Sequence, residues 1–275
     1  MSGTLYLCAT PIGNLGDMTP RCIETLKSAD LIAAEDTRQT VKLLNHFDIH
    51  TKMTSYYEHN KRDKGAYLIS LLNEGKNIAV VSDAGTPGIS DPGEELVEEC
   101  IKNGITVTSI PGAAALISAV ITSGLCTGRF CFEGFLSVNK KQRREHLEAV
   151  RTEKRTMIFY EAPHKLRATL RDFYETFGDR RISVARELTK KFEEISYLTL
   201  SEAIEKYEQI PPKGEFVLVI EGCREEKTAD YSDLSVEEHV KNYIDGGMSE
   251  NEAIKAAAKD RGMRKNEVYA VIKRK

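Results

Sequence analysis

The sequence contains no apolar run that approaches the roughly 18 residues a membrane-spanning helix requires. Its first segment, Met1–Cys8, is too short for a secretory signal peptide. The six cysteines form no CxxC pair and the six histidines are scattered, so the pattern predicts neither a zinc site nor a disulfide framework. We therefore expect a soluble protein of the reducing cytoplasm that needs no metal.

A strong excess of positive charge is also absent. The 39 Lys and Arg residues oppose 42 Asp and Glu, a formal net charge of −3, which excludes binding to nucleic acid through overall charge. Local basic patches do exist. Asn139–Arg144 has four cations and no acid, and eight Lys and Arg oppose two acids between Ala253 and Lys275. Such patches either contact RNA phosphates or form solvated helix faces.

The first half of the 275-residue chain alternates apolar, strand-like runs with amphipathic segments. The strand-like runs are Leu5–Ala9, Asp30–Ala34, Asn77–Val81 and Ile105–Ile110. This alternation predicts βαβ units and a mostly parallel sheet. In such sheets ligands bind at the carboxyl ends of the strands, so the loops that follow them are the first place to seek a site.

The second half predicts another α/β domain with a mixed sheet, followed by a helical tail. Its strand-like runs are Arg129–Leu136, Thr156–Tyr160, Arg180–Leu188 and Glu215–Ile220. We place domains at residues 1–115, 116–223 and 224–275, with a small-residue junction at Pro111–Gly124 and a polar linker at 224–234. Ser235 with Glu238 and Ser249 with Glu252 fit capping boxes, and Gly262 is expected to divide the tail into two short helices.

Three loops of the first half have compositions suited to a ligand. Ser82–Gly93 is too long for a plain turn, and its glycines permit close approach while Asp83 can accept hydrogen bonds from an amine or a ribose. Asp91 in that loop could instead only cap the next helix. Ala9–Asp17 could be a strand-to-helix turn, and Ile110–Leu116 could serve close helix packing or a flat ligand.

Three further segments concentrate charged and aromatic residues. Glu35–Arg38 could supply an acid–base pair or only cap a helix, and Phe159–Lys165 puts an aromatic ring, a carboxylate, a histidine and a lysine beside one strand end. Ala185–Glu194 is crowded with charges and could be no more than a solvated turn. These three segments therefore add candidate catalytic and ligand-binding residues, and the sequence does not distinguish among them.

Taken together, these loops resemble the tetrapyrrole methylase superfamily, and within it the bacterial ribose 2′-O-methyltransferases of small-subunit ribosomal RNA. The matching segments occur in the order Thr10–Leu15, Glu35–Arg38, Ser82–Gly93, Pro111–Ala115, Phe159–Lys165, Ala185–Lys190 and Gly214–Val217. The resemblance implies two α/β domains with S-adenosylmethionine in the cleft between them, a small helical extension and a homodimer. The implied substrate is a cytidine ribose in the decoding region of 16S ribosomal RNA, and the implied partner is that RNA within the assembled particle.

The resemblance also implies site residues. The expected cofactor contacts are Pro11, Ile12, Asp83, Gly85, Thr86, Ala113, Ala114 and Tyr160. The expected RNA contacts are Arg38, Lys140, Lys141, Arg143, Arg144, His164 and Lys165. Two departures stand out: Asp83 lacks the glycine and proline that flank it in the wider superfamily, and Lys165 replaces an arginine, which keeps the charge but loses a bidentate fork.

Methyl transfer from a sulfonium needs alignment more than covalent help, but a ribose hydroxyl must lose or share its proton. Candidate groups are Glu161, Asp36, Glu187 and Lys190. We expect Glu161 to orient or deprotonate the hydroxyl, and Lys190 with Arg186 to offset the negative charge that forms there. Two alternatives remain: a methyltransferase of tetrapyrrole precursors, which needs no basic patch, and a non-catalytic RNA-binding protein.

Overall fold

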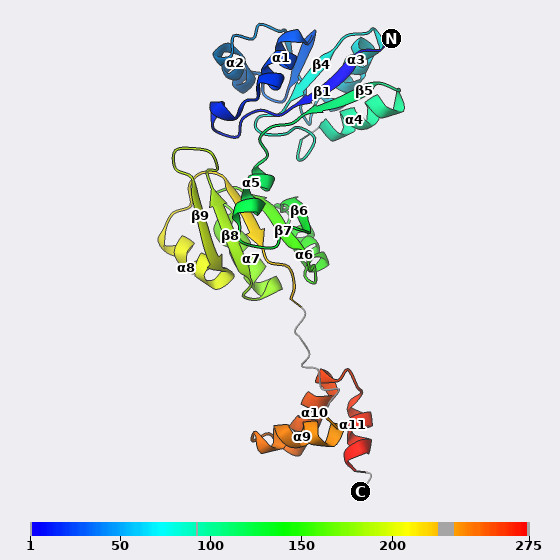
Figure 1. The fold of residues 1–275 in the computed structure, drawn as a ribbon, viewed down its shortest axis with the longest axis vertical. Coiled ribbons are helices and arrows are strands. Elements are labelled where there is room, and N and C mark those ends of the chain that lie inside the picture. The colour runs from blue at the N-terminus through cyan, green and yellow to red at the C-terminus, as the bar shows by residue number, and fades with distance from the viewer. Residues whose placement is uncertain (1, 92, 225–233, 274–275) are drawn as a thin grey trace. The chain divides into compact units, whose positions relative to one another are not determined.

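The computed structural model describes residues 2–91, 93–224 and 234–273 (Figure 1). It divides into two compact units, Met1–Cys223 and Arg224–Lys275. The first unit contains two five-stranded sheets, so the predicted α/β class with two sheets is confirmed. The predicted boundary after residue 115 falls at the start of helix α5, and most of the predicted linker, residues 225–233, lies outside the described residues.

The first sheet is wholly parallel, with strand order β3-β2-β4-β1-β5. Helices α1 and α2 pack on one face and α3 and α4 on the other. The elements are β1 (Thr4–Cys8), α1 (Pro20–Ser28), β2 (Leu31–Ala34), α2 (Thr37–His46), β3 (Met53–Ser55), α3 (Lys61–Asn73), β4 (Ile78–Val81), α4 (Gly93–Lys102) and β5 (Thr106–Ile110), with one turn of 3-10 helix at Leu15–Asp17.

Local sequence explains where these elements begin. Thr19 accepts a hydrogen bond from the Cys22 amide at 3.2 Å, and Pro20 occupies the first helical position, as predicted for α1. Strand β4 is buried throughout, because helices cover both faces of its sheet. Since all five strands run in one direction, the loops after β1, β2, β4 and β5 lie at one edge.

The second sheet is mixed, with order β6-β7-β10-β8-β9 and only the β6–β7 pair parallel. Helices α6, α7 and α8 pack on one face around the core that contains Phe159 and Phe173, and α5 packs on the other. The elements are α5 (Ala115–Thr122), β6 (Phe130–Phe135), α6 (Lys140–Ala149), β7 (Thr156–Glu161), α7 (Leu166–Phe177), β8 (Arg181–Arg186), β9 (Glu194–Thr199), α8 (Leu200–Gln209) and β10 (Phe216–Ile220).

The second unit is a helical domain with its own small core, built on Val240, Ile254 and Val268. Its described residues form α9 (Val236–Asp245), α10 (Glu250–Asp260) and α11 (Lys265–Ile272), three helices rather than the two predicted. Both predicted capping boxes are present, so α9 and α10 begin where the sequence placed them. No helix in the described part of the chain has the length and apolar character to span a bilayer.

Candidate functional site

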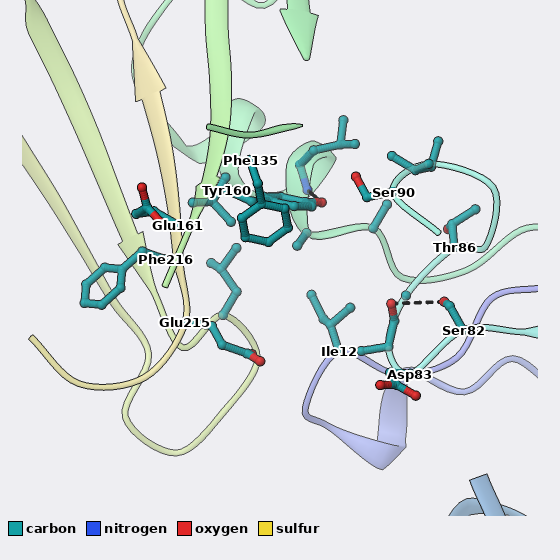
Figure 2. A pocket seen from close by; sticks show the side chains of 18 of the residues that line it. Ile12, Ser82, Asp83, Thr86, Ser90, Phe135, Tyr160, Glu161, Glu215 and Phe216 are labelled. Carbon is teal, nitrogen blue, oxygen red and sulfur yellow. Dashed lines mark hydrogen bonds between the residues drawn. The ribbon is translucent and has the colours of Figure 1, made fainter. Parts of the chain in front are cut away.

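A cleft of about 610 Å³ lies between the two sheets of the first unit (Figure 2). Its volume is typical of sites for small organic ligands. The first sheet contributes the ends of its loops, and the second contributes the ends of β6, β7, β8 and β10. The lining residues are Ile12, Glu35, Ser82–Thr86, Ile89–Asp91, Ala114–Leu116, Phe135, Tyr160–Pro163, Ala185, Leu188 and Glu215–Val217.

The 82–93 loop is shaped by its own side chains. Asp91 accepts hydrogen bonds from the Gly88 amide at 2.8 and 2.9 Å and from the Gly93 amide at 2.8 Å. A Cβ on Gly93 would lie 2.8 Å from the Asp91 carboxylate, so only glycine fits there. The Asp91 carboxylate therefore already has hydrogen-bond partners within the loop. Asp83, in contrast, is exposed at the edge of the cleft (Figure 2).

The three loops after β1, β4 and β5 are joined to one another. Thr10 and Gly85 exchange backbone hydrogen bonds of 2.9 and 3.1 Å, and Gly85 has a positive φ of 83°. The Thr86 hydroxyl donates to the Ala113 carbonyl at 3.0 Å. The structure thus brings together the segments that hold the predicted cofactor contacts. Six of the eight line the cleft; Pro11 and Ala113 lie in the same loops without lining it.

Glu35 is a half-buried acid that lines the cleft. Its carboxylate accepts a hydrogen bond from the Asp83 amide at 3.2 Å. Burial raises the pKa of Glu35, and the neighbouring charges of Asp83, Asp91 and Asp36 add to the effect despite that hydrogen bond. Asp83 is exposed at the edge of the cleft but partly desolvated there, and this partial desolvation raises its pKa, with the charge of Asp36 contributing. The cleft therefore presents an acidic edge to a ligand.

Asp36 and Arg38, both predicted site residues, lie beside this edge but do not line the cleft. Asp36 caps α2 and accepts hydrogen bonds from the Arg38 amide and guanidinium at 2.8 to 3.0 Å. Side-chain and backbone hydrogen bonds from Arg38 lower the pKa of Asp36 to about 2. Such an acid is a poor proton acceptor at neutral pH, so the geometry favours the helix-capping interpretation of Asp36.

Tyr160 connects the second sheet to helix α5. Its hydroxyl accepts a hydrogen bond from the Leu116 amide at 3.1 Å, in the first turn of α5. Its ring makes edge contacts with Phe132 and Phe135, whose centroids lie 4.9 and 5.5 Å away. Burial raises the pKa of Tyr160, so the hydroxyl stays protonated. The result is an aromatic wall on the second-domain side of the cleft (Figure 2).

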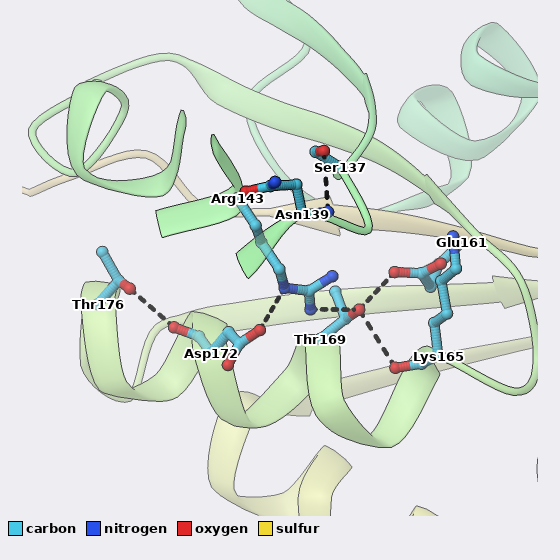
Figure 3. Close-up of polar contacts among 8 residues, drawn as sticks. All are labelled: Ser137, Asn139, Arg143, Glu161, Lys165, Thr169, Asp172 and Thr176. Atoms are coloured by element: carbon cyan, nitrogen blue, oxygen red, sulfur yellow. Dashed lines mark hydrogen bonds and ion pairs between the residues drawn. The ribbon is translucent and has the colours of Figure 1, made fainter. Parts of the chain in front are cut away.

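Glu161 follows Tyr160 in β7, and strand alternation therefore directs its side chain to the opposite face of the sheet. Thr169 donates its hydroxyl to one carboxylate oxygen of Glu161 (Figure 3). The Ala162 amide donates to the other oxygen at 2.8 Å. Only 4% of Glu161 is exposed. Both of its oxygens have partners within the second domain, which favours a role in shaping the 161–165 loop over contact with a substrate.

Arg143 completes this polar network from α6. Its guanidinium pairs with Asp172 and donates to the Thr169 hydroxyl at 2.8 Å (Figure 3). Its side chain is only 13% exposed, unlike the side chains of Lys140, Lys141 and Arg144 on the same helix. The predicted RNA patch is therefore divided: three cations face solvent and Arg143 holds α6 against α7. His164 is exposed and Lys165 is half-buried before α7.

Arg186 and Lys190 lie at the end of β8 and in the turn after it, and neither lines the cleft. Arg186 pairs with Glu194 of the neighbouring strand at 3.0 Å. Lys190 donates to Glu187 at 2.9 Å and to Glu215 at 2.6 Å. Burial lowers the pKa of Lys190, but the hydrogen bonds to Glu215 and Glu187 outweigh it and the net shift is upward.

Several lining residues were not selected from the sequence. Phe135, Leu188 and Val217 provide apolar surface from the second sheet and the turn after β8, and Ser82 provides a polar group from the first sheet. Glu35, which the sequence offered together with Asp36 as an acid–base pair, also lines the cleft. Strand β10 is apolar and buried at all five positions, so the sequence does not single out Val217; its place opposite Tyr160 follows from the β7–β10 register. Within residues 2–91, 93–224 and 234–273, no cluster of three His, Cys, Asp or Glu side chains could hold a metal.

Comparison with known proteins identifies the class to which this fold and cleft belong. A family model described as Tetrapyrrole (Corrin/Porphyrin) Methylases matches residues 4–204, and the chain belongs to that family. Within it, the chain is 54% identical over 98% of its length to Ribosomal RNA small subunit methyltransferase I of Halalkalibacterium halodurans, of which the match covers 94%. The protein of that name from Bacillus subtilis is 50% identical over 97% of this chain and 93% of its own.

Solved structures agree on the fold at much lower identity. A diphthine synthase is 13% identical, with a TM-score of 0.64 over 80% of this chain and 90% of its own. Uroporphyrin-III C-methyl transferase of Thermus thermophilus, solved with S-adenyl homocysteine, is 14% identical, with a TM-score of 0.57 over 80% of this chain and 97% of its own. At these identities the similarity extends to the fold alone.

Proposed function

We propose that the protein transfers a methyl group from S-adenosylmethionine to the 2′-hydroxyl of a cytidine ribose in the decoding region of 16S ribosomal RNA. The observation that carries this proposal is the cleft between the two sheets. The chain that forms it is 54% and 50% identical to two proteins named Ribosomal RNA small subunit methyltransferase I. We also infer that the enzyme acts in the cytoplasm, where its substrate is made.

The residues of the cleft suit the proposed cofactor. Tyr160, Phe135 and Ile12 offer apolar surface to the adenosyl and methionine carbons, and Gly85 lets backbone approach closely. The carboxylates of Asp83 and Glu35 suit hydroxyl and amino groups. S-adenosylmethionine supplies an activated methyl group, so this chain has to align a hydroxyl with it and exclude water.

Glu161 and Arg186 enter the proposed mechanism as positioning residues. Glu161 holds the Ala162 amide and Thr169, which fixes the loop that leads from the cleft to α7. Arg186 holds Glu194 and so fixes the end of β8, where Ala185 and Leu188 line the cleft. Each acts by keeping lining residues in place, since the charged group of each is already paired within the second domain.

The RNA is proposed to contact exposed cations of the second domain. Lys140, Lys141 and Arg144 are the exposed members of the α6 patch, and His164 lies after β7 near the cleft mouth. Each phosphate neutralised on single-stranded RNA should steepen the dependence of log affinity on log salt by about 0.7. Arg143 should contribute little, because its guanidinium is already committed to Asp172 and Thr169.

We infer a homodimer from the same resemblance. Helix α5 carries Ile117 and Ile121 one turn apart, 44% and 66% exposed, which makes its outer face the best candidate for the contact between subunits. A partner of the same sequence would cover this apolar stripe.

Methyl transfer from labelled S-adenosylmethionine tests the proposal. Purified protein is incubated with assembled small subunits, with naked 16S RNA and with a tetrapyrrole precursor, and the labelled position is mapped. We expect label on a cytidine 2′-oxygen in one of the RNA substrates, and about a hundredfold less in an Asp83→Ala variant, because the cofactor loses its polar contact. Label on the tetrapyrrole alone, or binding of RNA without transfer, would replace the proposal with one of its alternatives.

A further inference from the structure

Five residues from three separate segments of the chain meet where the two domains of the first unit face each other. We call Gly13, Glu187, Lys190, Gly214 and Glu215 the Lys190 cluster. We propose that Lys190 is a positioning residue: through this cluster it holds the Thr10–Gly13 loop, and with it the cofactor side of the cleft, in the geometry that binds S-adenosylmethionine. This inference rests on the proposed function for its ligand.

The stem of Lys190 lies directly over Gly13. A Cβ placed on Gly13 would be 2.4 Å from Cγ of Lys190 and 2.9 Å from its Cε. No side chain can therefore occupy position 13 while Lys190 keeps its place. The glycine belongs to the loop after β1, and the lysine follows β8 of the other sheet.

The ammonium group of Lys190 is fixed by two carboxylates of its own domain. It donates to Glu187 at 2.9 Å and to Glu215 at 2.6 Å, and the Glu215 amide donates back to Glu187 at 3.0 Å. A Cβ on Gly214 would lie within 2.6 Å of the Glu187 carboxylate, so this glycine too is required by the cluster. Lys190 consequently has little freedom to move away from Gly13.

The backbone around the cluster is held in an uncommon conformation. Glu187 and Thr189 have positive φ values of 52° and 66°, which residues with a side chain adopt rarely. Such backbone persists only where surrounding contacts enforce it, and it is frequent at functional sites. Here the contacts are the hydrogen bonds of Glu187 to Lys190 and Glu215.

The cluster reaches the cofactor loop through a short chain of contacts. Ile12, next to Gly13, packs against an apolar cluster that includes Leu188 and other residues of the second domain. A Cβ on Gly85 would lie 3.2 Å from Cγ2 of Ile12, so the two residues are closely packed. Gly85 and Thr10 exchange backbone hydrogen bonds, and Asp83 stands two residues before Gly85. Displacing Lys190 should therefore disturb the loop that carries Asp83.

This arrangement differs in its consequences from a lysine that stabilises charge on the substrate. A positioning residue affects the dissociation constant of the cofactor, whereas a charge-stabilising residue affects kcat and its pH profile. Lys190→Met keeps the alkyl stem over Gly13 but loses both ion pairs. Lys191→Met makes the same chemical change at the next, exposed residue and serves as the control.

The test is calorimetric titration with S-adenosylmethionine, combined with methyl-transfer kinetics at saturating cofactor. We expect Lys190→Met to weaken cofactor binding by about 10-fold, the loss expected for charged hydrogen bonds, with kcat within about threefold of the original. Unchanged affinity, with or without a large fall in kcat and a shifted pH profile, would overturn the proposal. An unmodified protein that bound no cofactor would instead refute the proposed function.

A second set of variants tests the contact itself and guards against misfolding of Lys190→Met. Gly13→Ala should weaken cofactor binding, and the loss should shrink when Lys190→Ala removes the colliding stem. Gly65→Ala, where a Cβ meets no atom within 4 Å, should leave binding unchanged. Additive effects of Gly13→Ala and Lys190→Ala would show that the two residues act independently and would contradict the proposal.

Discussion

The ionised carboxylate of Glu35 lowers the stability of the folded protein. Its carboxylate is drawn into the cleft, where burial and the charges of Asp83, Asp91 and Asp36 raise its pKa above the ordinary value of 4.5. The folded protein therefore favours the neutral acid. The stabilisation from this preference is complete below pH 4.5 and is lost as the pH rises through the raised pKa of Glu35.

Replacing Glu35 by Gln should consequently stabilise the protein at neutral pH but not in acid. The gain in free energy of unfolding should be below about 1 kcal/mol, because solvent screens charges in an open cleft. Urea unfolding between pH 4 and pH 8 measures it, with Glu24→Gln on the exposed face of α1 as the control. A gain that is equal at both ends of this pH range would contradict the account.

The sequence predicted which residue types belong to the candidate site better than it predicted the directions in which their side chains point. The loop that holds Asp83, Gly85 and Thr86 was recognisable as a ligand loop because it is long, rich in glycine and follows a buried strand, and all three residues line the cleft. The direction of Glu161 was not, since it depends on which face of β7 meets the cleft. That face is set by the packing of α5 against Ile158 and Val217, which no local pattern reveals.

Helix α5 depends on a cap from another element. Its own N-cap, Ala114, has no side-chain oxygen, and the Tyr160 hydroxyl accepts the Leu116 amide instead. An eight-residue helix with no cap of its own is marginal by itself. The contact therefore joins formation of α5 to the position of β7, and both line the cleft.

Tyr160→Phe tests this dependence, because it removes the hydroxyl and keeps the ring packing. We expect it to lower the free energy of unfolding by about 1 kcal/mol, the usual value of a helix cap or buried hydrogen bond. Tyr197→Phe is the matched control, since its exposed hydroxyl donates to the Thr122 carbonyl at the other end of α5. Equal losses for the two variants in urea unfolding would count against a special role for Tyr160.

At the element scale, helix caps and strongly apolar strands were predictable from the sequence, and strands rich in polar residues were not. Thr19, Ser235 and Ser249 begin their helices as predicted, because capping depends on residues only two or three positions away. Strands β3 and β9 were missed. Met53–Ser55 contains one apolar residue, and Glu194–Thr199 mixes three apolar residues with three polar ones, so both give only a weak apolar signal for strand prediction.

At the scale of the whole molecule, the alternation of strands and helices was enough to predict a parallel first sheet and a mixed second one. It could not predict the contact between the domains, because residues such as Gly13 and Lys190 are brought together by the tertiary fold alone. The cleft between the sheets combines loops that the sequence predicts with contacts that only the tertiary fold creates. The proposed function depends on which ligand binds in this cleft.

A crystal structure with S-adenosylhomocysteine bound tests this central claim most directly. The account predicts density for the nucleoside between the two sheets, with its polar groups beside Asp83 and its carbon atoms against Tyr160 and Ile12. Density at any other place, or a cleft that stays vacant at saturating ligand concentration, would contradict the account.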